Sequence, residues 1–183
     1  MKKVYIHSLG CSKNLVDSEN MTGILEKKGF IITDYADKAD YIIINTCSFI
    51  ADAQQESVNA ILYAADIKNK VNKKTKIIVT GCLAQRFGRE LAEEIPEVDI
   101  VAGTGGFEKI DEYIREYENT GHLIVDTSMR PLDEENLPRN ILTESWYAYL
   151  KIAEGCSNNC TYCVIPRLRG PYRSRRMEAI VEE

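Results

Sequence analysis

The sequence has no run of apolar residues long enough to cross a lipid bilayer. Its longest apolar runs fall far short of the roughly 20 residues that a membrane-spanning helix needs. A signal peptide is also missing near Met1, because His7 directly follows the short apolar run Val4-Tyr5-Ile6. We therefore expect a cytoplasmic protein that has no membrane partner.

Positive charge is not in excess, and histidine is scarce. The 23 Lys and Arg residues against 28 Asp and Glu give a net charge of −5, which offers no general attraction to nucleic acid or acidic membranes. Only His7 and His122 are available as imidazole ligands for a metal. With 44% hydrophobic and 28% charged residues, the composition is that of a globular protein and argues against disorder.

Short segments rich in Ile and Val alternate with helical patterns over residues 1–125. The strand-like segments are 4–9, 30–33, 41–46, 76–80 and 99–102, and the helical ones are 16–28, 51–69 and 107–117. Tyr41 to Ile44 are apolar at successive positions, which is typical of a strand buried on both faces of a parallel sheet. This alternation predicts an α/β domain with a doubly wound, five-stranded parallel sheet in the flavodoxin-like order 2-1-3-4-5.

Two further regions follow this predicted domain. Residues 126–144 contain Pro131 and Pro138 and show no periodic pattern, so we predict a linker. In residues 145–183, Trp146 to Ile152 has the pattern of a strand, and Met177 to Glu183 that of the opening of a helix. The chain stops within this helical pattern without a stop signal, so we expect an N-terminal fragment of a longer protein.

Half of the cysteines form a compact motif. Cys156, Cys160 and Cys163 have the spacing C-x3-C-x2-C. In a reducing compartment, clustered cysteines bind metal more often than they form disulfides. Three thiolates can bind three irons of a 4Fe-4S cluster and leave the fourth open, whereas a structural zinc site needs four ligands. The motif therefore favours a 4Fe-4S cluster over zinc.

The other cysteines each come directly after the end of a predicted strand. They are Cys11, Cys47 and Cys82. Because the carboxyl ends of parallel strands meet at one edge, where doubly wound sheets bind ligands, we expect these cysteines to hold a second cluster. Gly10, Gly81 and Gly155 each precede a cysteine, which predicts close approach of the backbone and N–H donation to cluster sulfurs.

The motifs around both groups of cysteines resemble those of the radical S-adenosylmethionine methylthiotransferases. The matching segments are residues 8–19 (SLGCSKNLVDSE), 45–47 (NTC), 81–82 (GC) and 155–166 (GCSNNCTYCVIP). The resemblance extends over the whole chain. The opening segment is most similar to the members that modify an aspartate of ribosomal protein S-twelve. The members that act on tRNA adenosine commonly have Gln-Met-Asn or Lys-Val-Asn after the first Gly-Cys.

The resemblance implies an enzyme with two 4Fe-4S clusters and S-adenosylmethionine. The cluster on Cys156, Cys160 and Cys163 would bind S-adenosylmethionine, whose one-electron cleavage yields a radical that removes hydrogen from an unactivated carbon. The cluster on the other three cysteines would hold the sulfur or methylthio group, and a second S-adenosylmethionine would supply the methyl. Residues 145–183 would then begin a radical S-adenosylmethionine (β/α) barrel.

The same resemblance predicts partners. They are ribosomal protein S-twelve or the small ribosomal subunit, and an electron donor of the flavodoxin or ferredoxin type. We expect a monomer, and the sequence assigns no catalytic residue. Two alternatives stay open at this point: a tRNA adenosine methylthiotransferase of the same family, and a non-catalytic iron–sulfur or zinc sensor with an arginine segment that binds nucleic acid.

Weaker features have two interpretations each. An arginine segment is either a solvated basic loop or a site for a carboxylate, a phosphate or an acidic partner; it comprises Arg167, Arg169, Arg173, Arg175 and Arg176. Gly103 to Gly106 favour a plain turn over a phosphate cradle, because no full phosphate-loop pattern follows. Asn14 and Asn45 either donate hydrogen bonds near the cluster or serve in turns and caps.

Overall fold

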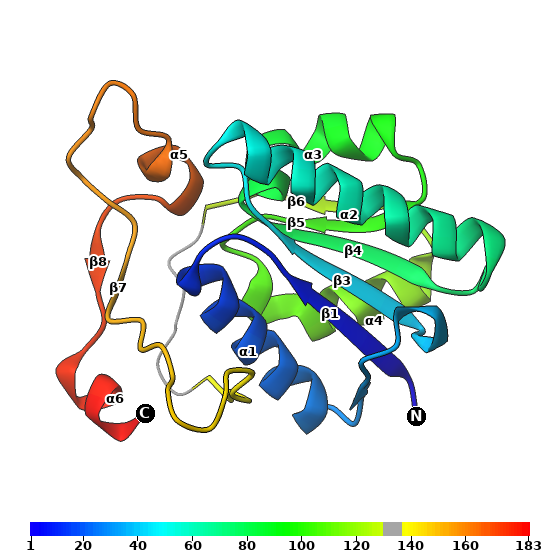
Figure 1. The fold of residues 1–183 in the computed structure, drawn as a ribbon, viewed down its shortest axis with the longest axis horizontal. Helices are drawn as coiled ribbons and strands as arrows, with labels where there is room; N and C mark the ends of the chain where they lie inside the picture. Colours follow the sequence, from blue (N-terminus) through cyan, green and yellow to red (C-terminus); the bar gives the residue numbers. More distant parts are fainter. Residues whose placement is uncertain (130–136) are drawn as a thin grey trace.

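A parallel β-sheet forms the centre of the molecule (Figure 1), in a computed structural model that describes residues 1–129 and 137–183. Six strands lie in the order β2-β1-β3-β4-β5-β6, and each neighbouring pair is parallel. The strands are β1 (Lys3–Ser8), β2 (Ile31–Ile32), β3 (Tyr41–Thr46), β4 (Lys76–Gly81), β5 (Val98–Ala102) and β6 (Ile124–Asp126). The predicted order 2-1-3-4-5 is confirmed. The prediction of five strands was one too few, because β6 adds a short strand beside β5 at the predicted boundary of residue 125.

Helices cover both faces of the sheet (Figure 1). On one face lie α2 (Ala51–Lys70) and α3 (Cys82–Glu94), and on the other lie α1 (Ser12–Lys27) and α4 (Ile110–Thr120). Two short 3-10 helices lie on opposite faces, η1 (Ala36–Lys38) with α2 and η2 (Phe107–Lys109) with α1. Three of the four α-helices match the predicted segments, but α3 is a helix that the prediction lacked.

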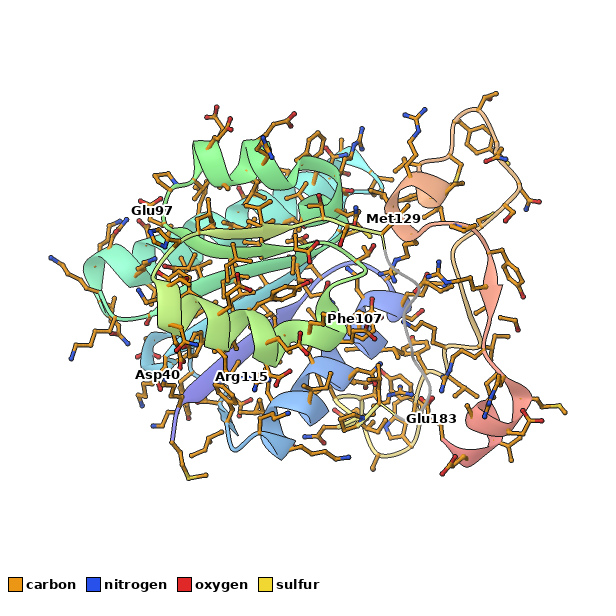
Figure 2. All side chains as sticks on the ribbon, turned by 180° about the vertical axis from the view of Figure 1, so that it is seen from behind. Asp40, Glu97, Phe107, Arg115, Met129 and Glu183 are labelled. Carbon is orange, nitrogen blue, oxygen red and sulfur yellow. The ribbon has the colours of Figure 1, made fainter. Side chains whose placement is uncertain are left out.

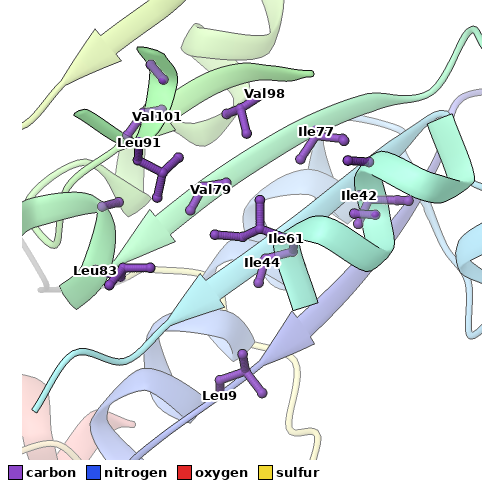
Figure 3. Close-up of a cluster of buried hydrophobic side chains, with 14 of the residues drawn as sticks. Leu9, Ile42, Ile44, Ile61, Ile77, Val79, Leu83, Leu91, Val98 and Val101 are labelled. Carbon is purple, nitrogen blue, oxygen red and sulfur yellow. The ribbon is translucent and has the colours of Figure 1, made fainter. Parts of the chain in front are cut away.

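Alternate residues of β3 build the two hydrophobic cores. Ile42 and Ile44 pack with α2 and α3, as Figure 3 shows, whereas Ile43 packs with α1 and α4. The burial of Tyr41 to Ile44 on both faces is thus confirmed. Each isoleucine removed from water in this way contributes about 1.5–3 kcal/mol, which fixes the register of the central strands.

The C-terminal segment, residues 145–183, lies beside the carboxyl edge of the sheet (Figure 1). It contains β7 (Ala153–Glu154), α5 (Ile165–Arg169), β8 (Arg173–Ser174) and α6 (Met177–Glu182). The predicted strand over Trp146–Ile152 was wrong, because these residues have no strand to pair with and the Trp146 side chain is 80% exposed. The helix predicted at Met177 is confirmed. Since β7 and β8 are antiparallel, no parallel barrel unit is present in residues 145–183.

The second half of the predicted linker packs along α1. Residues 130–136 of this linker lie outside the described residues, and 137–144 contain no helix or strand. The Arg139 guanidinium donates to the Glu19 carboxylate at 2.6 and 2.9 Å. Gly23 allows the Pro138 backbone to approach, because a Cβ there would lie 2.6 Å from the Pro138 carbonyl carbon.

The amino edge of the sheet is closed by polar contacts. Figure 2 shows Asp40 and Glu97, which precede β3 and β5, at the end of the sheet opposite the segment that contains Glu183. Near them, Lys68 donates to Asp99 at 2.6 Å, and Tyr41 donates to Glu118. Burial, with help from Glu118, raises the pKa of Tyr41 well above its ordinary value. No helix within residues 1–129 and 137–183 is both long and apolar enough to span a membrane.

Candidate functional site

Three cysteines meet at the carboxyl edge of the sheet. Cys11 precedes the first residue of α1, Cys47 follows the last residue of β3, and Cys82 is the first residue of α3. The strands before them, β1, β3 and β4, are neighbours in the sheet. The expectation that these cysteines share one edge is therefore confirmed. Their role as metal ligands remains a prediction.

Gly10 brings the first loop into direct contact with Cys47. A Cβ at Gly10 would lie 2.6 Å from Cys47 Cβ and 2.9 Å from its Sγ, closer than van der Waals contact permits. Gly10 also has φ +86°, a left-handed conformation that favours glycine. The close approach predicted from this glycine is thus present, and it places the Cys11 loop beside the Cys47 thiol.

Hydroxyl side chains hold the backbone around the two inner cysteines. Ser57 Oγ accepts from the Cys47 N–H and donates to the Cys47 carbonyl, both at 3.0 Å. Ser48 Oγ donates to the Cys82 carbonyl at 3.1 Å. These serine side chains are buried, so each hydrogen bond offsets the cost of removing the polar groups from water and holds the loop in one conformation. Both thiols are therefore held in place before any ligand binds.

Asn14 and Asn45 join the loops by their amide groups. Asn14 Nδ2 donates to the carbonyls of Leu9 and Thr46, both at 2.9 Å. Asn45 Nδ2 donates to the Asn14 carbonyl at 2.7 Å and to Ser18 Oγ at 3.0 Å. The structure of the described residues shows neither a cap nor a turn contact for these two side chains, since α1 has no side-chain cap; their amide donors are used to join the loops.

Gly81 shapes the third loop. Its φ is +88°, and a Cβ there would lie 2.4 Å from Asn45 Oδ1 and 2.5 Å from the Thr46 carbonyl oxygen. Only glycine leaves room for β3 and β4 to end side by side at this point. The strand therefore passes directly into α3, with Cys82 as the first helical residue.

Burial keeps the Cys82 thiol protonated in the metal-free protein. Burial raises the pKa of Cys82 to about 11, Arg169 opposes this rise, and the nearby Cys47 and Cys11 add to it. A cationic metal centre would replace the proton, because thiolate is the form that binds metal.

The second group of cysteines lies on one exposed loop between β7 and α5. Cys156 and Cys163 are partly exposed, and Cys160 is exposed. The Cys163 N–H donates to the Cys160 carbonyl at 3.0 Å, and the Cys156 N–H donates to the Gly170 carbonyl at 3.1 Å. Gly155 has φ +73° and allows the backbone of Gly170 to approach the loop, since a Cβ at Gly155 would lie 2.4 Å from the Gly170 carbonyl oxygen.

A pocket opens between this loop and α3. Cys160, Cys163 and Arg167 line one side, and Gln85 and Arg86 of α3 line the other. Two guanidinium groups at one pocket suit a ligand with an anionic group. The first domain thus contributes side chains to the surroundings of the second cysteine group.

A buried network of charges connects the two groups of cysteines. Lys151 Nζ donates to Asp17 Oδ1 at 2.6 Å, and Arg169 Nη1 donates to Asp17 Oδ2 at 3.0 Å and to Glu154 Oε2 at 2.8 Å. All four side chains are at most 5% exposed. Arg169 and Lys151 hold the pKa of Glu154 down at about 2, although burial alone would raise it.

This network was only partly predictable from the sequence. Arg169 belongs to the arginine segment, and its burial contradicts the solvated-loop interpretation for this residue. The pairing with Asp17 could not be predicted, because no local pattern connects residues that are 152 positions apart. In contrast, the plain turn at Gly103 to Gly106 agrees with the prediction, since the Gln85 side chain fills the space beside Gly103.

The donor set of each group suits an iron–sulfur cluster. Within residues 1–129 and 137–183, no group of three or more Cys, His, Asp or Glu side chains is placed to hold a metal ion. A single ion needs its donors around one point, whereas each cysteine of a cluster binds a different iron. All six cysteines are free thiols, three at one sheet edge and three on one loop, which is the donor chemistry that two clusters require.

The fold and the site define a doubly wound α/β protein with cysteines gathered at the ligand-binding edge of its sheet. The chain belongs to the family described as Uncharacterized protein family UPF0004, whose family model matches residues 3–103. That match covers β1 to β5 and so includes Cys11, Cys47 and Cys82.

Relatives with assigned names match over the full chain. Proteins named ribosomal protein uS12 methylthiotransferase RimO are 51% identical in Clostridioides difficile, 53% in Trichlorobacter lovleyi and 49% in a Thermoanaerobacter species. Each alignment covers 100% of this chain and 40–42% of the relative. The chain therefore spans about two fifths of the length of the curated relatives it matches. The predicted resemblance to methylthiotransferases is confirmed.

Proposed function

We propose that this chain forms part of a methylthiotransferase that modifies an aspartate of ribosomal protein S12 at its β-carbon. The main support is the arrangement of two cysteine groups, one at the sheet edge and one on an adjoining loop, connected by buried charges. The names of relatives about 50% identical over the whole chain favour the ribosomal protein over tRNA as the substrate. The proposed partner is ribosomal protein S12 or the small ribosomal subunit.

Two 4Fe-4S clusters and S-adenosylmethionine are the proposed cofactors. Cys156, Cys160 and Cys163 would hold the cluster that binds S-adenosylmethionine, and Cys11, Cys47 and Cys82 would hold the other. When bound, these groups supply the reductive cleavage of S-adenosylmethionine and the sulfur for transfer. A flavodoxin- or ferredoxin-type protein is the proposed electron donor.

The side chains of this chain have binding and positioning roles in that reaction. The serines and asparagines around Cys47 and Cys82 fix the loops, so the thiols need not reorganise when they bind iron. Burial of these two cysteines excludes water from the inner part of the site. Arg86 and Arg167, which line the pocket beside Cys160, are suited to hold an anionic group of the cofactor or substrate.

A division of the chain into parts accompanies this proposal. Residues 1–125 would be the sulfur-carrying α/β domain, 126–144 a linker, and 145–183 the beginning of the S-adenosylmethionine domain. Because β7 and β8 are antiparallel, residues 145–183 contain no unit of a parallel barrel. A barrel would therefore require further residues. The chain by itself is therefore proposed to be inactive.

Anaerobic reconstitution of the full-length protein tests the cofactors. We expect about eight irons per chain and formation of deoxyadenosine under reducing conditions. Mass spectrometry of ribosomal protein S12, from cells with and without the gene, should show the methylthio group only when the gene is present. Tightly bound zinc without iron would instead support the sensor, and a methylthiolated tRNA with unmodified S12 would support the tRNA enzyme.

A further inference from the structure

Arg169 contacts both parts of the molecule through one buried guanidinium. It is the last residue of α5 and is only 4% exposed. Nη1 donates to Asp17 on α1 and to Glu154 on β7, and Nη2 donates to Asn14 on α1 at 2.5 Å. The planar guanidinium thus joins two elements that are far apart in the sequence, which the single ammonium of a lysine cannot do in the same geometry.

The partners of Arg169 lie near the cysteines in the sequence. Asn14 and Asp17 belong to the first turns of α1, which begins directly after Cys11, and Glu154 precedes Cys156 by two residues. Asn14 in turn donates to the carbonyls of Leu9 and Thr46, which lie beside the first cysteine group. One side chain therefore reaches the first cysteine group through Asn14 and the second through Glu154.

The buried charges around Arg169 balance without any contribution from cysteine. Asp17 and Glu154 carry the negative charges, and Lys151 and Arg169 carry the positive charges, all at most 5% exposed. Lys13, whose side chain is 41% exposed, adds a contact to Glu154 at 3.4 Å. If Arg169 is removed, Asp17 keeps only Lys151 as a cationic partner, and the first cysteine group loses the positive charge beside it.

We propose that Arg169 is a positioning residue for the cluster on Cys11, Cys47 and Cys82, because it holds the start of α1 against the Cys156 loop and keeps its positive charge beside that cluster. This inference rests on the proposed function. Positive charge near a cluster favours the reduced form of the cluster. Arg169 therefore raises the reduction potential of this cluster.

Redox titration of the full-length protein, followed by electron paramagnetic resonance, tests the proposal. Cys156, Cys160 and Cys163 are replaced by alanine, so that only the first cluster gives a spectrum, and about four irons per chain verify that it is present. Arg169→Gln should then shift the midpoint potential to a more negative value. Arg169→Lys, which keeps the charge, should shift it less.

Arg139→Gln is the matched control. Arg139 is partly buried, with its side chain 9% exposed, and it also joins a later segment to α1, through Glu19; its contacts are Glu19, Glu183 and the Tyr149 carbonyl. Its loss should lower stability and leave the potential unchanged. If the Arg169→Gln variant does not bind iron, the midpoint potential of the Arg169→Lys variant is compared with that of the parent protein. An unchanged potential in Arg169→Lys would then contradict the proposal.

The possible results separate this inference from the proposed function. Four irons with the same potential in the parent and in the Arg169 variants would overturn the role of Arg169 and leave the proposed function standing. Equal shifts from Arg139→Gln and Arg169→Gln would reduce Arg169 to a structural residue. Absence of iron from the first group would overturn both proposals.

Discussion

Single glycines decide how closely the cysteine loops approach one another. Gly10 and Gly29 have the same left-handed conformation, with φ +86° at both positions. Their surroundings differ, because a Cβ at Gly10 would overlap Cys47, whereas nothing lies within 4 Å of a Cβ at Gly29. The pair therefore separates the cost of the backbone conformation from the cost of crowding at the site.

We expect Gly10→Ala to destabilise the protein more than Gly29→Ala. The left-handed conformation costs about 1 kcal/mol at either position. Crowding against Cys47 adds about 1–3 kcal/mol at Gly10 only, and it displaces the thiol. Urea unfolding measures both variants. Equal losses of unfolding free energy would show that the two loops have no close contact at Gly10.

At the scale of elements, periodic and buried segments were predictable and short or interrupted ones were not. The strand at Tyr41 to Ile44 and the helix from Ala51 had clear patterns. By contrast, α3 begins directly at Cys82 without a capping side chain and has a non-helical residue, Phe87, in its interior. The three residues of β6 are too few for a pattern. The strand predicted over Trp146–Ile152 failed because a strand needs a partner that local sequence does not supply.

The candidate site was predictable only in part for a related reason. Strand ends and the C-x3-C-x2-C spacing located both groups of cysteines from local sequence. The polar contacts that hold them, such as Ser57 to Cys47 and Arg169 to Asp17, depend on the folded arrangement of distant segments. Such contacts have no local pattern, so the structure was required to find them.

The C-terminal segment is held on α1 by buried ion pairs, and Asp17 is central among them. Asp17→Asn should weaken both the Lys151 and the Arg169 contacts, at a cost of about 3 kcal/mol, because two buried cations then share the one buried carboxylate of Glu154. Hydrogen exchange should become faster in residues 151–175 and stay unchanged in β3 and β4.

The exposed pair of Lys70 and Asp66 provides the control for this experiment. Their side chains are 70% and 60% exposed, so Asp66→Asn should change little. If exchange in residues 151–175 is the same in Asp17→Asn and in the parent protein, the segment is held by other contacts.

In the whole molecule, the amino edge and the carboxyl edge of the sheet carry different kinds of side chain. The amino edge is closed by ion pairs and tyrosine hydrogen bonds, as at Asp99 and Glu118. The carboxyl edge holds three cysteines and meets the segment with the other three (Figure 1). This arrangement brings both groups of cysteines to the same end of the molecule, which agrees with the proposed function.

The most direct test of this account is an assay of the full-length enzyme in which Cys11, Cys47 and Cys82 are all replaced by alanine. Deoxyadenosine and methylthiolated S12 are measured in the same reaction. We predict that S-adenosylmethionine cleavage continues and that S12 stays unmodified, because only the sulfur-carrying site is lost. Replacement of Cys156, Cys160 and Cys163 should abolish both products. Methylthiolation of S12 by the first triple variant would contradict the proposed role of the cysteines at the sheet edge.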